Sequence, residues 1–230
     1  MSSEVRHLVD DARPVPVVRL GGVLDGTTAG TVRDVLLDVL AGQPPAILVD
    51  VGELEIGEAG AVGVLREVAR DTRWWPAAHL TLRHADAEAW QGSGWDVRND
   101  GAGPPADDRR LSLELEPQVS AARHCRAVIT EAGRRWGRAE LVGSACIVAT
   151  ELVNNVVAHA RTPMVVLVAT TGDGLSVAVR DRSPHLPAYQ GAPVSPTAPG
   201  GRGMLLIDAV ASRWGSLPLA DGKVVWALLG

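Results

Sequence analysis

The sequence predicts an α/β protein made of two domains. In both halves of the chain, short apolar runs typical of strands alternate with stretches that repeat apolar residues at helical spacing. Residues 97–110 (VRNDGAGPPADDRR) are polar, rich in glycine and proline, and without apolar periodicity. The 230 residues suffice for two small domains. We therefore predict a first domain over 1–100, a linker over 101–110 and a second domain over 111–230.

The first half is predicted to run strand, helix, strand, helix and strand. These elements are expected, in chain order, at residues 15–20, 28–41, 46–51, 59–70 and 80–82. The run AILVDV at 46–51 is continuously apolar except for one aspartate, which is typical of a strand buried on both faces. Both helices carry their apolar residues three and four positions apart. Short connections between such elements favour a layered α/β domain.

The second half is predicted to combine three helices with an antiparallel hairpin and two further strands. The elements are expected, in chain order, at residues 111–115, 117–133, 140–159, 163–170, 175–180, 204–212 and 223–229. Pro117 suits the first turn of a helix. Gly172, Asp173 and Gly174 suit the turn of a hairpin. A long loop rich in proline and glycine, residues 183–203, precedes the last helix.

Composition and charge exclude several classes of function. The net charge is −5, and no basic stripe is present, so direct nucleic-acid binding is not expected. No run approaches the roughly 18 apolar residues of a membrane span, and the first ten residues lack the pattern of a signal peptide. We therefore expect a cytoplasmic protein without a membrane partner. Cys125 and Cys146 lie in apolar-periodic stretches and are expected to be buried rather than to form a disulfide or metal site.

Glu151 and Asn155 are the first candidate functional residues. They lie four positions apart on the predicted helix 140–159, so both project from one helix face. The amide oxygen of an asparagine can ligate Mg²⁺, and a glutamate can orient or deprotonate a nucleophile. Taken alone, this common pattern would be a solvated polar stripe.

Asp181 and the glycine cluster at 200–203 are the second and third candidates. Asp181 follows an apolar strand, where its carboxylate can accept a hydrogen bond from an exocyclic amine such as that of adenine. Gly201, Arg202 and Gly203 precede a predicted helix, so their backbone N–H groups and the arginine can bind phosphate. Alone, the aspartate would be a turn residue and the glycines a flexible helix cap.

The order of these three signals resembles the N, G1 and G2 boxes of the GHKL (Bergerat) ATPase superfamily. The segments ELVNNVVAHA, VRDRSPHLP, GGRGMLLIDAVASRWG and DGKVVWALL resemble the anti-sigma-factor serine kinases of the SpoIIAB/RsbW group over residues 111–230. The resemblance implies an α/β sandwich that binds ATP and Mg²⁺ between helices and a mixed sheet.

By position, the resemblance implies a role for each candidate residue. Glu151 matches the catalytic base, Asn155 the Mg²⁺ ligand and Asp181 the adenine-binding aspartate. Gly201, Arg202 and Gly203 match the phosphate-side loop. The chain departs from the pattern in having Ser183 in place of a frequent glycine, Val224 in place of a threonine near the base, and four prolines in or beside the lid segment 188–199.

The first half resembles a STAS domain, the family of the anti-anti-sigma factors that such kinases phosphorylate. The resemblance rests on VVRLGGVLD and on ILVDVGELEIGEAGAVGVL, within about residues 14–95. The phosphoacceptor serine of the family falls on Gly60, while Glu58 keeps the acidic character of the motif. No serine or threonine lies between Asp50 and Asp71, so this half cannot be phosphorylated in the usual way.

The motifs and the two resemblances suggest three possible functions. The first is an ATP-dependent serine kinase that phosphorylates a separate STAS-domain anti-anti-sigma factor in a partner-switching pathway controlling transcription, with a sigma factor as a further partner. The second is a catalytically silent adapter in which ATP sets the conformation and the STAS-like half docks on partners. The third, the ATPase domain of a sensor histidine kinase, is disfavoured because we find no upstream two-helix segment with a phosphoacceptor histidine. Relatives often dimerise through this domain, so a homodimer is a further expectation.

Overall fold

The chain forms two compact units, Met1–Asp107 and Asp108–Gly230. The computed structural model describes residues 4–11, 15–75, 78–84, 88–90, 93–98, 109–187 and 202–230. Both units are α/β, which confirms the predicted fold class. The division between the units falls inside the segment 101–110, most of which lies outside the described residues, so the limits of the linker stay a prediction.

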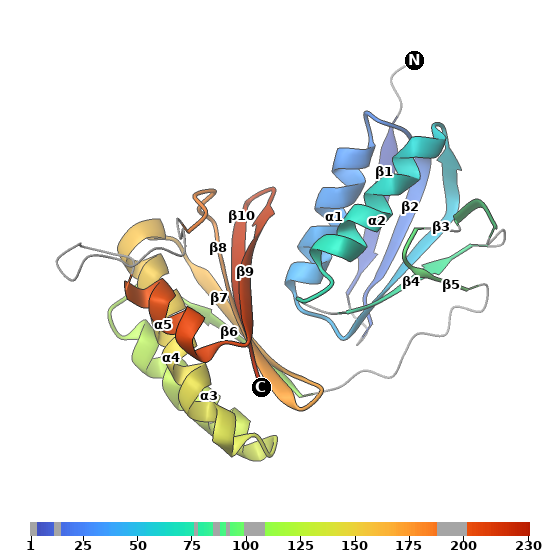
Figure 1. Cartoon of the computed structure of the whole chain (residues 1–230). Helices are drawn as coiled ribbons and strands as arrows, with labels where there is room; N and C mark the ends of the chain where they lie inside the picture. Colours follow the sequence, from blue (N-terminus) through green and yellow to red (C-terminus); the bar gives the residue numbers. More distant parts are fainter. Residues whose placement is uncertain are drawn as a thin grey trace. The chain divides into compact units, whose positions relative to one another are not determined.

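The first unit is a five-stranded sheet with its two α-helices on one face (Figure 1). The strands are arranged in chain order: β1 (Val5–Asp10), β2 (Val17–Leu24), β3 (Ala46–Ile56), β4 (His79–Arg83) and β5 (Asp96–Arg98). β1 pairs with β2 antiparallel, and the other neighbours are parallel. The helical elements are α1 (Ala29–Ala41), η1 (Ala59–Val62), α2 (Gly63–Asp71) and η2 (Glu88–Trp90).

Apolar residues at helical spacing on α1 and α2 are buried, together with most apolar residues of β2 and the continuous apolar run of β3. Leu36 and Leu40 of α1, Val49 of β3, and Leu65 and Val68 of α2 are almost completely buried. Burial of each such side chain contributes about 1.5–3 kcal/mol to folding. The apolar periodicity of the sequence therefore places the helices correctly in this unit.

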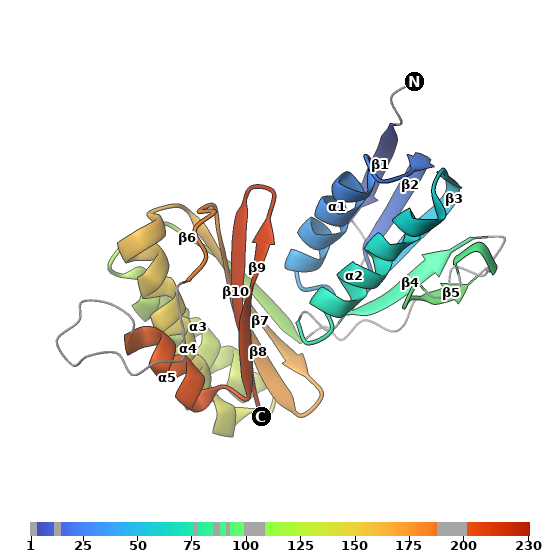
Figure 2. The same cartoon turned by 45° about the horizontal axis from the view of Figure 1, so that its top comes forward.

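The second unit is a five-stranded antiparallel sheet that carries three α-helices on one face (Figure 2). The strand order is β6-β7-β8-β10-β9, so the last strand inserts between β8 and β9. The strands are β6 (Arg110–Leu115), β7 (Met164–Thr171), β8 (Gly174–Asp181), β9 (Arg213–Leu219) and β10 (Gly222–Leu229). The helical elements are α3 (Ala121–Arg135), η3 (Ala139–Leu141), α4 (Val142–Asn155), the π-helical turn η4 (Val156–Ala160) and α5 (Arg202–Val210). The resemblance predicted a mixed sheet, and the antiparallel pairing of every neighbouring pair of strands corrects that detail.

Three strands are not expected from the sequence: β1, β5 and β9. Each of them lies at the edge of its sheet. β1 is exposed along most of its length, so it has no apolar face to recognise. β9 contains Pro218, which an edge strand tolerates because one of its sides needs no N–H donor.

The helical stretch Ala139–Ala160 is long and apolar enough to cross a membrane by length and composition alone. The sequence predicts no membrane span, because it has no uninterrupted apolar run of about 18 residues. Its residues Ala145, Val148 and Leu152 belong to the buried core of the second unit, packed with residues of α3, α5 and the sheet. These buried positions account for part of the apolar composition of the stretch.

Candidate functional site

The second unit contains a pocket of about 670 Å³. Its wall is formed by the end of α4, the turn η4, strands β8 and β10, the segment after β8 and the start of α5. Much of the wall is apolar, with Leu152, Val156, Val179, Met204 and Val225 among the lining residues. A pocket of this size with an apolar wall and a few polar groups is typical of a small-molecule site and suits a planar ring.

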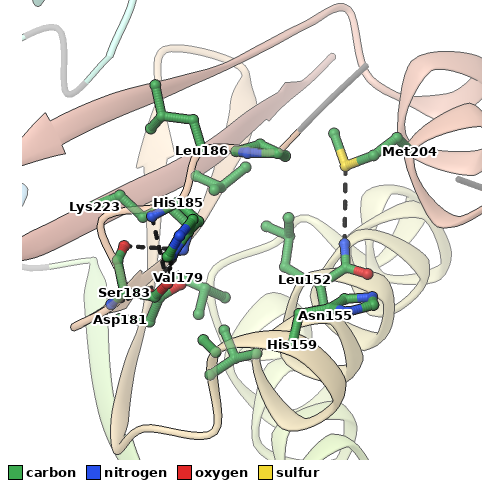
Figure 3. A pocket seen from close by; sticks show the side chains of 14 residues that line it. Leu152, Asn155, His159, Val179, Asp181, Ser183, His185, Leu186, Met204 and Lys223 are labelled. Carbon is green, nitrogen blue, oxygen red and sulfur yellow. Dashed lines mark hydrogen bonds and ion pairs between the residues drawn. The ribbon is translucent and has the colours of Figure 1, made fainter. Parts of the chain in front are cut away.

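The polar groups of the pocket lie on two sides. Figure 3 shows Asp181, Ser183 and Lys223 together on one side, and Asn155 facing Met204 on the other. The first group comes from the ends of β8 and β10, and the second from α4 and α5. A ligand in the pocket would therefore contact one polar group with one end and the other group with its opposite end.

Asp181, the last residue of β8, is almost completely buried, with 3 % of its surface exposed. Its Oδ1 accepts a hydrogen bond from Lys223 Nζ at 2.8 Å and another from the backbone N–H of Ser183 at 2.7 Å. Lys223 Nζ also donates to the carbonyl oxygen of Ser183 at 3.1 Å. Asp181 and Lys223 thus form a buried ion pair at the end of the pocket.

The sheet register places Lys223 beside Asp181, because β10 pairs with β8 so that these two residues are opposite each other. The close approach depends on Gly222, where a Cβ atom would collide with the carbonyl oxygen of Asp181. The backbone φ of Gly222 is +154°, which a residue with a side chain rarely adopts. Glycine at the start of β10 therefore allows the two backbones to approach closely where Lys223 follows.

The pairing also corrects the expectation that Val224 lies near the base. Alternate residues of a strand point to opposite faces of the sheet. Lys223 and Val225 line the pocket, whereas Val224 is buried and is not among its lining residues. The residue of β10 that offers a polar contact in the pocket is therefore Lys223.

Asn155 lies at the point where α4 widens into the π-helical turn Val156–Ala160. Such turns are rare and frequently occur at functional sites. The turn ends at Arg161 in a left-handed conformation, with φ of 55°. Asn155 Nδ2 donates to the sulfur of Met204 at 3.8 Å, so the amide nitrogen is directed to α5. Its amide oxygen is left as a ligand for a cation.

Glu151 lies one helical turn before Asn155, as the spacing predicts, but it does not line the pocket. It is half-buried and faces the first turn of α5. A Cβ atom on Gly203 would come within 2.6 Å of Glu151 Oε2. The structure therefore brings Asn155 and Asp181 together in one cavity and places Glu151 beside it, against Gly203.

Part of the predicted phosphate loop lies outside the described residues. α5 begins at Arg202, and Gly203 lies in its first turn. Gly201, the side chain of Arg202 and the lid segment 188–199 are not described. The phosphate-binding roles of Gly201, Arg202 and Gly203 stay predictions.

Within the described residues, no group of three or more histidine, cysteine, aspartate or glutamate side chains could hold a metal ion. A magnesium ion at Asn155 would therefore depend on oxygen atoms of the ligand for its other contacts. Mg²⁺ usually binds in this way, through one or two protein groups together with substrate phosphates and water. The donor set of the pocket fits a metal that enters with a nucleotide.

Comparisons with known proteins match the second unit to a family. Residues 113–227, half of the chain, match the family described as histidine kinase-like ATPase domain. No curated protein matches the chain.

Two solved structures are similar to parts of the chain. An anti-sigma factor antagonist from Mycobacterium paratuberculosis is 24 % identical, with a TM-score of 0.32, over 36 % of this chain and 70 % of the other. The RsbU and RsbW domains of a Mycobacterium tuberculosis protein are 17 % identical, with a TM-score of 0.40, over 74 % of this chain and 42 % of the other. The chain thus spans less than half of the second structure.

Proposed function

The chain belongs to the histidine kinase-like ATPase domain family, and we propose that it is an ATP-dependent protein-serine kinase whose substrate is a separate STAS-domain protein. The family implies ATP binding. The observation that carries the proposal is the pocket of the second unit, which holds Asp181 at one side and Asn155 at the other. In this proposal the adenine lies against the apolar wall and the triphosphate extends past Asn155 toward α5.

Each residue of the site has a chemical task in this proposal. Asp181 accepts a hydrogen bond from the exocyclic amine of adenine, and its burial strengthens this contact because water does not compete. Asn155 binds Mg²⁺ through its amide oxygen, and the ion when bound neutralises charge on the phosphates. Glu151 accepts the proton of the attacking serine hydroxyl, and Arg202 binds the phosphate being transferred.

The STAS-like first unit supports a substrate on another protein. Gly60 lies in the exposed turn η1 that follows β3, where the acceptor serine of the family falls. It has no hydroxyl group, and no serine or threonine lies within residues 50–71. Glu58 lies beside it, with its Oε1 at 3.9 Å from where a Cβ atom of residue 60 would be. A carboxylate thus stands near the acceptor position, and the phosphate has to go to a different STAS domain.

Incubation with Mg²⁺ and γ-labelled ATP is expected to label a serine on a STAS-domain partner and to leave this chain unlabelled at its first unit. Candidate anti-anti-sigma factors that retain the acceptor serine serve as substrates, and the same factors with that serine changed to alanine serve as controls. Phosphoserine is detected by mass spectrometry. ATP binding without transfer to any of these partners would contradict the kinase proposal.

The second candidate function is that of an adapter, which binds ATP but transfers no phosphoryl group to a partner. In that case ATP sets the conformation of the second unit, and the STAS-like unit docks on partners. The loss of the acceptor at Gly60 favours this role for the first unit. Under both proposals, we expect a sigma factor as a further partner. We also expect a homodimer and a cytoplasmic location.

The substitution Gly203→Ala is expected to slow phosphoryl transfer about tenfold or more, and to lower the transfer rate by a larger factor than it lowers ATP affinity. The new methyl group would lie 2.6 Å from Glu151 Oε2, so the carboxylate has to move away from α5. The flexible side chain can make this movement without unfolding the protein. Single-turnover transfer and calorimetric binding measure the two quantities separately.

Gly143→Ala is the matched control, because Gly143 lies on α4 and a Cβ atom there meets nothing within 4 Å. It should transfer phosphate at the rate of the unmodified protein. An equal rate in the Gly203→Ala variant would show that the contact between Glu151 and α5 has no role in transfer.

A further inference from the structure

The buried ion pair of Asp181 and Lys223 changes what the end of the pocket can recognise. The side chains are 2 % and 9 % exposed, respectively, and both line the cavity. Burying two charges has a high desolvation cost, which stability alone does not explain, because apolar residues of similar size would fill the space as well. The pair therefore points to a use of both charges in binding.

Once the hydrogen bonds within the ion pair are formed, one acceptor and one donor remain available to a ligand. Oδ1 of Asp181 already accepts from Lys223 Nζ and from the N–H of Ser183. Within the described residues, Oδ2 accepts no hydrogen bond. The ammonium group of Lys223 has three hydrogens, of which one is donated to Asp181 and one to the carbonyl of Ser183. The ion pair itself thus offers one carboxylate oxygen next to one N–H donor.

We propose that Lys223 is a specificity-determining residue that donates a hydrogen bond to N1 of adenine while Asp181 accepts one from the neighbouring exocyclic amine. This inference rests on the ATP binding proposed above, and it identifies the group that forms a hydrogen bond with N1 of the base. The edge of adenine that carries the amine and N1 lies opposite the bond to the sugar. Asp181 and Lys223 lie on the side of the pocket away from Asn155 and α5, so the end of the base, rather than its flank, faces them (Figure 3).

Guanine fits the same groups less well. Its corresponding edge has one acceptor, O6, and two donor groups, N1–H and the 2-amino group. Binding both donors needs both oxygen atoms of a carboxylate. Oδ1 of Asp181 already accepts from Lys223 and from the N–H of Ser183, so only Oδ2 remains, and one oxygen atom cannot lie in line with two donors that point in parallel directions. The pair is therefore complementary to adenine, with one donor and one acceptor.

The first test uses the unmodified protein and two nucleotide analogues, each lacking one ring nitrogen. Binding of ATP, 1-deaza-ATP and 7-deaza-ATP is measured by calorimetry in the presence of Mg²⁺. 1-Deaza-ATP, which lacks the acceptor N1, is expected to bind about tenfold more weakly than ATP or worse, as expected for losing a hydrogen bond to a charged group. 7-Deaza-ATP is the matched control and should bind like ATP. Equal binding of ATP and 1-deaza-ATP, or tighter binding of GTP than of ATP, would overturn the inference.

The second test assigns the preference to Lys223. In the Lys223→Met variant, which keeps an unbranched side chain one atom shorter and removes the charged donor, ATP affinity is expected to fall and the difference between ATP and 1-deaza-ATP to shrink to about twofold or less. The ratio of the two affinities is the readout, because a general loss from leaving Asp181 unpaired affects both nucleotides alike. A difference that stays as large as in the unmodified protein would show that Lys223 only neutralises Asp181. Failure of the unmodified protein to bind ATP at all would instead contradict the proposed function.

Discussion

Replacing Asp181 with asparagine is expected to weaken ATP binding by about a hundredfold or more, because a buried charge-assisted hydrogen bond is lost and an N–H donor takes the place of an acceptor. Asparagine keeps one oxygen, which can still accept from Lys223 and from the N–H of Ser183. Its NH₂ group then occupies the position of Oδ2 and faces the amine of adenine. Two donors facing each other in a buried site repel, so the variant should discriminate against adenine.

The substitution also leaves Lys223 with a neutral partner, so stability has to be measured beside affinity. Removing one member of a buried ion pair costs about 3–5 kcal/mol, and the remaining amide oxygen should keep the loss below that range. Thermal unfolding without nucleotide measures this loss, and calorimetric titration of the folded protein measures affinity. Asp173→Asn is the control, because Asp173 is fully exposed in the hairpin turn between β7 and β8. An unchanged affinity in Asp181→Asn would refute the assignment of the base site.

The elements that the sequence predicts well are those with a strong apolar pattern. The continuous run of β3 and the periodic helices α1 and α4 are found close to their expected places because burial determines both the pattern and the fold. The end of α4 is the exception. Helical spacing continues to His159, but the backbone widens into a π-helical turn after Asn155. Apolar periodicity does not distinguish these two helical forms, so the sequence could not reveal the turn.

For the site, the sequence predicts single residues better than their partners. Asp181 is recognisable because a carboxylate follows an apolar strand, and Asn155 because it lies four residues after Glu151. The contact of Asp181 with Lys223 joins residues 42 positions apart and depends on the insertion of β10 between β8 and β9. A lysine at the head of the apolar run KVVWALL was a usable signal, since a buried lysine needs a partner. Val224, the position to which the resemblance points, is the next residue along the strand and therefore lies on the opposite face of the sheet.

The side chain of Glu151 lies outside the pocket, whereas Asn155, its neighbour on the same helix face, lines it. If a residue acts in the chemical step but not in ATP binding, its substitution should lower the rate of phosphoryl transfer and leave ATP affinity unchanged. Contact with Gly203 at the start of α5 places the carboxylate where the end of the triphosphate is expected, at a distance from the base. Binding and transfer should therefore separate in a variant of this residue.

Glu151→Gln is expected to lower the rate of phosphoryl transfer to a STAS-domain serine by about 10²–10⁴-fold, the usual contribution of a general base. ATP affinity should change by about threefold or less, which corresponds to well under 1 kcal/mol. Transfer is measured in a single turnover at saturating ATP, so that weak binding cannot imitate slow chemistry. Glu140→Gln is the matched control, because Glu140 is exposed in η3 and precedes the same helix. A large loss of ATP affinity would show that Glu151 acts in nucleotide binding and not in the chemical step. An unchanged transfer rate would exclude Glu151 as the general base.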